Sequence, residues 1–140
     1  MLKGINWIAV IVAVVLLEGL GYAWYGPLFG AQWLAALGHE PDMSNANLNM
    51  GLGVVNTLIV VIGLAWLTGR LGATSLAASV GVAVAAWFFF DFTTQSLEYL
   101  YMGMSQQLVC INMAFQLVSY VITGAVLALV KFGRPAAAVA

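Results

Sequence analysis

The chain has 140 residues, of which 64% are hydrophobic and only 6% are charged, and its mean hydropathy is +1.02. A soluble domain carries roughly 25% charged residues to solvate its surface, so the composition excludes a soluble domain. Four Lys and Arg residues form no basic patch, which excludes nucleic-acid binding, and a single cysteine excludes an intramolecular disulfide. The composition predicts that the lipid bilayer is the solvent.

Four segments are long and apolar enough to cross a membrane, since a spanning helix needs about 20 mostly apolar residues. The first of them exceeds the usual length of a signal-peptide core and lacks an Ala-x-Ala cleavage site, so we interpret it as a retained helix. The sequence therefore predicts an all-α membrane protein, with one four-helix domain over residues 1–134 and a flexible tail at 135–140. The predicted transmembrane helices are 5–24, 49–68, 73–97 and 108–132.

The long connection between the first two spans has a helical pattern of its own. Pro27 suits the first turn of a helix, Gly38 suits its end, and apolar side chains repeat at helical spacing between them. Trp33 in this stretch is typical of a membrane–water interface. We therefore expect a short interfacial helix over 27–38.

Basic residues all fall on one side of the four predicted spans. They precede the first span, join the second to the third, and lie at the end of the fourth: Lys3, Arg70, Lys131 and Arg134. The connections on the other side, at 25–48 and 98–107, have none. The positive-inside rule then predicts a multi-pass protein with both termini in the cytoplasm.

Small and aromatic residues predict how the helices pack. Small residues let two helices approach closely, and they recur at four-residue intervals in the third and fourth spans: Ala73, Ala77, Gly81 and Ala85, then Gly124 and Ala128. Aromatic residues near span ends predict belts at the two membrane interfaces. These belt residues are Trp7, Tyr22, Trp24, Tyr25, Tyr99 and Tyr101.

Every span carries a strongly hydrogen-bonding side chain in its outer half, the half away from Lys and Arg. At about 1.5 Å per residue, these side chains lie roughly 6–12 Å below the outer span ends. They fall on one face per helix: Glu18, Tyr22 and Tyr25; Asn49, Gly53 and Asn56; Asp91, Thr94, Gln95 and Glu98; Asn112, Gln116 and Tyr120. Polar faces in lipid point into the bundle or towards water. We therefore expect one shared intramembrane binding site, formed by Glu18, Tyr22, Asn56, Asp91, Gln95, Asn112 and Gln116.

The carboxyl groups of Glu18 and Asp91 have no predicted cationic partner. Every Lys and Arg is assigned to the opposite edge of the membrane, and His39 is the one basic candidate on the outer side. A charged carboxylate at depth costs about 3 kcal/mol unless it is paired. These groups are therefore expected to be protonated, or to await a cation from outside. Hydrogen bonding between helices, with no ligand, is an equally good interpretation.

His39 and Glu98 are further candidates in the outer connections. His39 with Glu40 and Asp42 suggests a metal site, but the sequence has no second His, so solvated loop charge is the favoured interpretation. Asp91, Glu98 and His39 would serve as acid and base in an enzyme acting on lipid or quinone, but no nucleophile–base pair is visible. We expect no catalytic residue, no metal and no cofactor.

Two functions from different classes follow from these patterns. The first is transport or binding of a small cation or polar solute, with protons exchanged at Glu18 and Asp91. The second is a structural or accessory subunit, which packs against a larger membrane complex or against copies of itself as a homo-oligomer. The unpaired acidic groups favour the first function by a narrow margin.

Residues 22–38 resemble a known family. The stretch YAWYGPLFG at 22–30, followed by Trp33 and Gly38, resembles the signature of small bacterial membrane proteins grouped as domain of unknown function 1761. Weaker similarity lies at 91–101 and 112–120. The resemblance implies a four-span layout in a bacterial inner membrane, and it implies no activity. Small multidrug exporters also have four short spans and a glutamate in the first, but the long 25–48 connection, Asp91 and the charge bias depart from that pattern.

Overall fold

The structure is a computed structural model that describes residues 4–41 and 43–132. The described residues form helices and no strand, which confirms the all-α class. The elements are α1 (Trp7–Ala23), the π-helical segment η1 (Trp24–Leu28), α2 (Gly30–Leu37), α3 (Ala46–Arg70), α4 (Leu76–Ala86), the π-helical segment η2 (Trp87–Phe92), α5 (Thr93–Met102) and α6 (Gln106–Leu129). The predicted tail at 135–140 lies outside the described residues, as do Lys3, Asp42 and Arg134.

Four continuous helical stretches are long and apolar enough to cross a membrane: Trp7–Leu28, Ala46–Arg70, Leu76–Met102 and Gln106–Leu129. The chain is therefore a multi-pass integral membrane protein. The third stretch extends beyond the predicted end at residue 97, because η2 and α5 continue α4 without leaving helical dihedral angles at Phe92 and Thr93. Asp91 consequently lies about 16 Å from the end of its helix, which is deeper than the sequence predicted.

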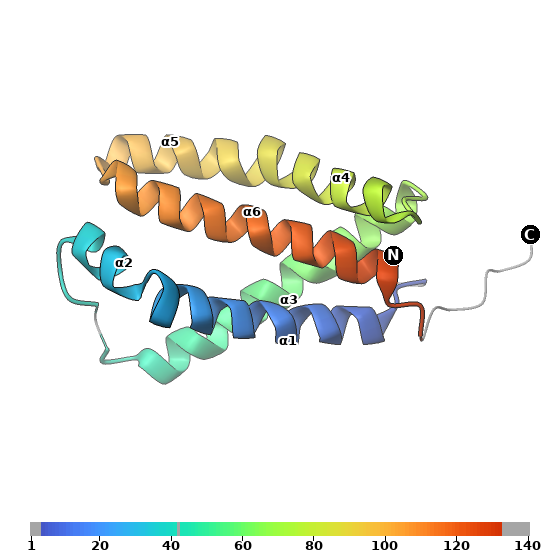
Figure 1. The fold of residues 1–140 in the computed structure, drawn as a ribbon, viewed down its shortest axis with the longest axis horizontal. Coiled ribbons are helices and arrows are strands. Elements are labelled where there is room, and N and C mark those ends of the chain that lie inside the picture. The colour runs from blue at the N-terminus through green and yellow to red at the C-terminus, as the bar shows by residue number, and fades with distance from the viewer. Residues whose placement is uncertain (1–3, 42, 133–140) are drawn as a thin grey trace, which may run out of the picture.

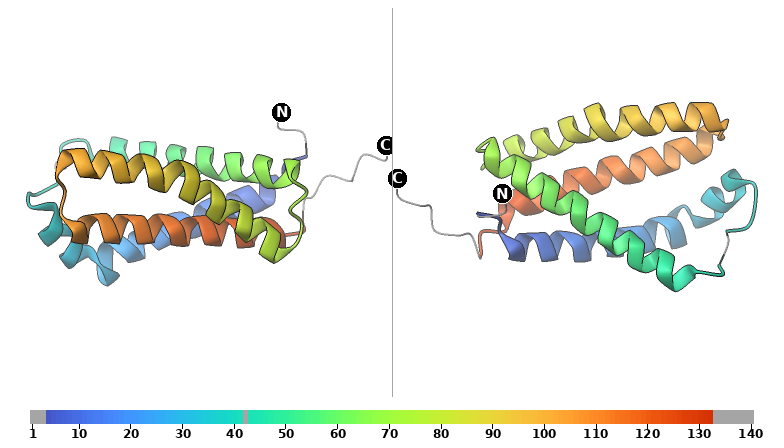
Figure 2. Two further views of the ribbon diagram at one scale, coloured as in Figure 1. Left: turned by 90° about the horizontal axis from the view of Figure 1, so that it is seen from above. Right: turned by 180° about the vertical axis from the view of Figure 1, so that it is seen from behind.

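The four stretches run antiparallel in a bundle (Figure 1). The continuous stretch of α4, η2 and α5 lies along one side of α6, and α1 lies along the other, while α3 crosses α1 and α6 at an angle (Figures 1 and 2). Asn6 ties the start of α1 to the end of α6, because its Nδ2 donates to the Val130 carbonyl at 2.8 Å. Arg70 and Lys131 therefore share this end of the bundle, which we call the basic end.

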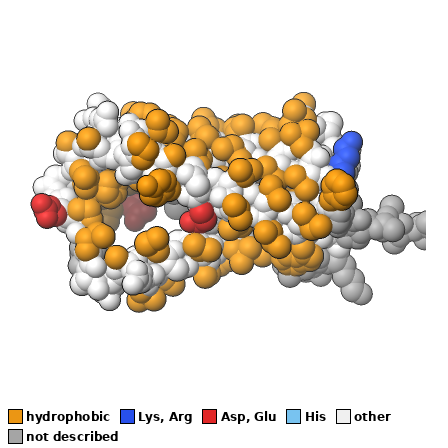
Figure 3. Space-filling view, turned by 60° about the horizontal axis from the view of Figure 1, so that its bottom comes forward, with side chains coloured by type: hydrophobic (Ala, Val, Ile, Leu, Met, Phe, Trp, Pro, Cys, Tyr) orange, Lys and Arg blue, Asp and Glu red, His pale blue; other side chains and the backbone are white. Residues whose placement is uncertain are grey.

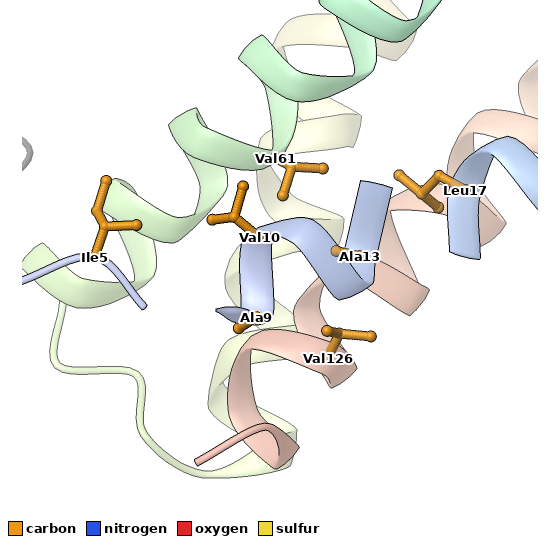
Figure 4. Packing of buried hydrophobic residues seen from close by; sticks show 7 residues of the cluster. All are labelled: Ile5, Ala9, Val10, Ala13, Leu17, Val61 and Val126. Carbon is orange, nitrogen blue, oxygen red and sulfur yellow. The ribbon is translucent and has the colours of Figure 1, made fainter. Parts of the chain in front are cut away.

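The hydrophobic core lies in the half of the bundle towards the basic end (Figure 4). Alanines on α1 let its backbone approach α3 and α6 closely, and Val61 and Val126 fill the remaining space. The core cluster consists of Ile5, Ala9, Val10, Ala13, Leu17, Val61 and Val126. The opposite half of the bundle contributes no residue to this cluster, which leaves room there for polar side chains.

The closest helix contact joins α4 to α6 at Gly124. A Cβ atom on Gly124 would lie 2.9 Å from the Val80 Cα, and the Ser79 Oγ donates to the Gly124 carbonyl at 2.7 Å. The prediction of close packing at Gly124 is confirmed. The predicted small-residue stripe on α4 does not make the contact with α6, and that prediction is wrong. Ser79 and Ala83 are buried at the contact, whereas Ala77, Gly81 and Ala85 are exposed. Small residues lie on two faces of α4, and the hydroxyl of Ser79 distinguishes the face that bonds to α6.

A short helix follows η1, as the sequence predicts, but it occupies Gly30–Leu37 rather than 27–38. Pro27 lies inside η1 and not in the first turn of α2. Gly38 ends α2 with φ +77°, and the Ser105 Oγ donates to the Ala36 carbonyl at 3.1 Å. Helix α2 is thereby attached to the start of α6. Its position in the membrane interface stays a prediction.

Candidate functional site

Helix α6 presents a row of polar side chains to the helices on both sides of it. Asn112, Gln116 and Tyr120 are spaced four residues apart and are all half-buried. Asn112 uses both ends of its amide, since its Oδ1 accepts from the Tyr25 hydroxyl at 3.1 Å and its Nδ2 donates to the Tyr99 hydroxyl at 3.1 Å. One side chain of α6 therefore links η1 to α5.

The carboxyl group of Asp91 faces the same row of side chains. Gln95 Nε2 donates to Asp91 Oδ1 at 2.8 Å, and the Tyr120 hydroxyl lies near the Asp91 carboxyl. Asp91 is half-buried, and no described basic side chain is paired with it. The carboxyl is held by neutral groups alone at the middle depth of its span.

Gln116 lies on α6 between the contacts of Asn112 and those of Asp91, because it is one helical turn from Asn112 on one side and from Tyr120 on the other. Its Oε1 is buried and has no hydrogen-bond partner, and the same is true of the Trp87 Nε1 on η2. An unpartnered buried polar atom costs about 1–3 kcal/mol. We call the whole group the polar cluster; it comprises Tyr25, Asp91, Gln95, Tyr99, Asn112, Gln116 and Tyr120.

The π-helical segment η2 helps to keep one row of side chains on the third span turned towards α6. Ser79, Ala83, Asp91, Gln95 and Tyr99 are spaced by four residues or by a multiple of four. In a regular α-helix, each step of four residues moves the side chain about 40° further around the helix axis. The wider turns of a π-helix offset this drift. As a result, both Ser79 in the core and Tyr99 in the polar cluster contact α6.

The segment η1 turns the end of the first span towards α6 in the same way. Gly26 has φ −106° and ψ −106°, which are not helical, and Pro27 has no N–H group to donate. The helix therefore kinks at these two residues. Just before the kink, the Trp24 Nε1 donates to the Ile111 carbonyl at 3.2 Å and the Tyr25 hydroxyl donates to Asn112.

Aromatic rings close the polar cluster on the α2 side. Ring centroids lie 5.0 Å apart for Tyr25 and Phe115, 4.6 Å for Trp24 and Phe29, and 5.5 Å for Tyr25 and Trp33. Apart from Phe115 on α6, these residues come from the WYGPLFG stretch and the tryptophan that follows it. That stretch is therefore a packing unit that fixes Tyr25 against α6.

The chain matches one family model, described as protein of unknown function (DUF1761), over residues 8–128. The chain belongs to the DUF1761 family. No curated protein and no solved structure matches it. The match spans all four transmembrane helices, so the resemblance seen at residues 22–38 extends over most of this DUF1761 chain.

Gly30 offers a direct test of how this family signature packs. A Cβ atom there would lie 2.7 Å from the Tyr25 carbonyl oxygen, a backbone atom that cannot turn aside. We expect Gly30→Ala to lower the free energy of unfolding by about 1–3 kcal/mol, measured by thermal unfolding of the purified protein in detergent. Gly19→Ala is the matched control, since a Cβ atom there meets nothing within 4 Å. Equal melting temperatures for the two variants would contradict this packing.

The half of the molecule away from the basic end is hollowed (Figure 3). One acidic side chain lies deep in the hollow, and others lie near its edge and at that end of the molecule, whereas the visible basic side chain lies at the opposite end (Figure 3). The described carboxyl groups and the described Lys and Arg side chains are thus separated along the bundle.

The structure brings together four of the seven intramembrane residues predicted for the shared site: Asp91, Gln95, Asn112 and Gln116. The expectation that all four helices contribute is wrong for the monomer, because Glu18, Tyr22 and Asn56 are exposed and make no hydrogen bond. Of the predicted polar face on the first span, Tyr25 bonds to α6, while Glu18 and Tyr22 are exposed. The outer half of α3 leaves the bundle (Figure 2).

The candidates from the outer connections also lie apart from the polar cluster. His39 is exposed, and its Nδ1 lies 3.0 Å from the Glu40 carbonyl oxygen. Glu98 and Thr94 are exposed as well, whereas the neighbouring Tyr99 is half-buried against α6. Within the described residues, no group of three His, Cys, Asp or Glu side chains could hold a metal ion.

Three of the predicted belt residues also bond within the bundle. Trp24, Tyr25 and Tyr99 donate or accept hydrogen bonds there, and their position in aromatic belts stays a prediction. Tyr22 and Tyr101 are 82% and 84% exposed, in keeping with a belt position. The Gly-Pro pair at 26–27 is a sequence signal for the kink that follows Tyr25. The sequence has no comparable signal for η2.

Proposed function

We propose that this protein binds a small cation or a small polar solute at the polar cluster, as one step of its transport across the membrane. The observation that carries the proposal is the Asp91 carboxyl, which lies at mid-depth, accepts a hydrogen bond from Gln95 and has Tyr120 as a neighbour. A carboxylate in this environment needs a cation or a proton. The unpartnered Gln116 Oε1 and Trp87 Nε1 add one acceptor and one donor for a ligand.

Asp91 exchanges a proton for the ligand in this proposal. Without a ligand the carboxyl is neutral and keeps its proton. When a cation binds, the proton leaves to water, the carboxylate carries the negative charge, and the net charge of the site does not change. Glu18 does not reach the polar cluster within the monomer, so we assign the exchange to Asp91 alone.

The ligand enters through the hollow opposite the basic end, which we propose faces away from the cytoplasm. Arg70 and Lys131 share the basic end with the start of α1, and basic residues favour the cytoplasmic side of a membrane. This orientation places both termini in the cytoplasm. We propose the inner membrane as the location.

Asp91→Asn tests the proposal, with Glu98→Gln as the matched control on the same helical stretch, because Glu98 is exposed. The probes are ammonium, methylammonium, choline and urea, added to purified protein in detergent and followed by titration calorimetry. A weakly buffered solution with a pH dye measures proton release. We expect Asp91→Asn to bind the preferred cation at least about tenfold more weakly and to release no proton, whereas Glu98→Gln behaves as the wild type. Absence of binding by all four probes, or equal binding by both variants, would contradict the proposal.

A further inference from the structure

Two buried polar atoms on the helices that hold Asp91 have no hydrogen-bond partner among the described residues. The Gln116 Oε1 on α6 can only accept a hydrogen bond, and the Trp87 Nε1 on η2 can only donate one. Most buried polar groups in proteins have a partner. An acceptor and a donor that both lack one, in a single site, indicate a ligand that carries the complementary groups.

The two atoms belong to residues on opposite sides of Asp91 along the bundle. Trp87 is four residues before Asp91 on the third span, in the direction of the basic end. Gln116 is four residues before Tyr120, whose hydroxyl lies near Asp91, and α6 runs antiparallel to the third span (Figure 1). Gln116 therefore lies further from the basic end than Asp91 does. Four residues of helix rise about 6 Å, so the acceptor and the donor flank the carboxyl by about one turn each.

The charge of the site fits a singly charged cation. Asp91 is the one acidic side chain of the polar cluster, while Arg70 and Lys131, the described basic side chains, lie at the basic end. A calcium ion takes about six to eight oxygen ligands, and within the described residues no three acidic, His or Cys side chains come together. One carboxylate balances one positive charge, so the site suits a monovalent ion.

The surroundings of Asp91 favour an organic ammonium over a metal ion. Trp87 and Phe92 are half-buried with ring centroids 5.2 Å apart, and Phe92 stacks on Phe88 with centroids 5.6 Å apart. Aromatic rings attract organic cations and supply no oxygen ligand to a metal. The Gln116 Oε1 also needs an N–H donor, which a primary ammonium has and a quaternary ammonium lacks.

The Trp87 Nε1 adds a requirement at the other end of the ligand. Its N–H group needs an oxygen acceptor, so a simple alkylammonium would leave this atom without a partner. A hydroxyl supplies the acceptor without adding charge. A carboxylate or phosphate would bring a second negative charge to a site that no described basic side chain joins, which is costly in a buried environment. The ligand therefore combines a primary ammonium with a hydroxyl.

We propose that the polar cluster binds a small amino alcohol, of which ethanolamine is the simplest example. Its ammonium group donates to the Asp91 carboxylate and to the Gln116 Oε1, and its hydroxyl oxygen accepts from the Trp87 Nε1. The inference rests on the proposed function, cation binding at Asp91, and names the class of that cation.

Titration calorimetry of the purified protein in detergent tests the class with five ligands. We expect ethanolamine to bind at least about fivefold more tightly than each of the others. Ethylammonium lacks the hydroxyl, choline lacks the N–H groups, and the free amino acid glycine carries a carboxylate. Phosphoethanolamine represents a lipid headgroup, which carries a phosphate. Equal or tighter binding of any of these four would overturn the inference and leave cation binding at Asp91 in place. Absence of binding by every cation would overturn the proposed function itself.

Trp87→Phe keeps an aromatic ring and removes the N–H group. In this variant, ethanolamine should bind no more tightly than ethylammonium, whereas ethylammonium should bind as it does to the wild type. Trp66→Phe is the matched control, because Trp66 is half-buried on α3 beside Arg70 at the basic end. It should keep the wild-type preference for ethanolamine. An unchanged preference in Trp87→Phe would overturn the inference.

Gln116→Leu gives a second readout that does not depend on the tryptophan. Both ethanolamine and ethylammonium carry the ammonium group that donates to the Gln116 Oε1. We therefore expect this variant to bind both ligands about fivefold more weakly and to keep the ratio between their affinities. Wild-type affinity of Gln116→Leu for the two ligands would overturn the proposed contact.

Discussion

Replacing Gly124 by valine is expected to lower the free energy of unfolding more than the other substitutions proposed here at helix contacts. The Cβ atom would lie 2.9 Å from the Val80 Cα and 3.0 Å from the Ser79 carbonyl oxygen. Both are backbone atoms, so α4 and α6 must move apart. The movement also breaks the hydrogen bond from Ser79 to the Gly124 carbonyl. Overpacking of this kind costs about 1–3 kcal/mol, and the lost bond adds to it.

Thermal unfolding in detergent, followed by tryptophan fluorescence, measures this effect. Gly81→Ala is the matched control, because Gly81 lies on α4 but a Cβ atom there meets nothing within 4 Å. Alanine also has the higher helix propensity, so Gly81→Ala should melt at the wild-type temperature or slightly above it. A Gly124→Val protein that melts with the control would mean that α4 and α6 are not in contact at this point.

Replacing Asn112 by leucine is expected to have the second large effect. Leucine removes the acceptor for the Tyr25 hydroxyl and the donor to the Tyr99 hydroxyl in one step. Two partly buried hydroxyls then lose their partner, and η1 and α5 lose their link through α6. We expect the free energy of unfolding to fall by about 1–3 kcal/mol.

A double-mutant cycle with Tyr25→Phe shows whether the loss of stability in Asn112→Leu comes from the hydrogen bond between Tyr25 and Asn112. In the Tyr25→Phe background, Asn112→Leu should cost less than it does in the wild type. Asn49→Leu is the control, since Asn49 is exposed at the start of α3. Additive effects of Asn112→Leu and Tyr25→Phe would rule out the proposed link between η1 and α6.

The sequence was a good guide to the spans and to the polar face of α6. Twenty apolar residues in a row have one stable arrangement in lipid, a helix that satisfies its own backbone. The row at Asn112, Gln116 and Tyr120 was also predicted correctly, because α6 is a regular helix in which four-residue spacing holds its phase. The family signature at 22–38 could be recognised, but its packing role could not be derived from it.

Prediction from spacing was less successful on the first and third spans. Four-residue spacing put Glu98 beside Asp91 and Tyr25 beside Glu18, whereas Glu98 and Glu18 are exposed and Tyr25 and Tyr99 bond to Asn112. The two spans also leave regular α-helical geometry at η1 and η2. Gly26 and Pro27 give a local reason for η1, whereas the aromatic residues of η2 do not differ from those of a regular helix.

The sequence by itself determined the solvent, the four spans and their shared basic end, because hydrophobicity and charge act on each segment independently of its neighbours. Only the tertiary structure decided which polar residues meet. Asn112 bonds to Tyr25 and Tyr99 from two other helical stretches, and Asn56 is left outside because α3 crosses the bundle at an angle. Such contacts depend on how helices pack against each other, and packing is set by shape across the interface rather than by the pattern within one helix.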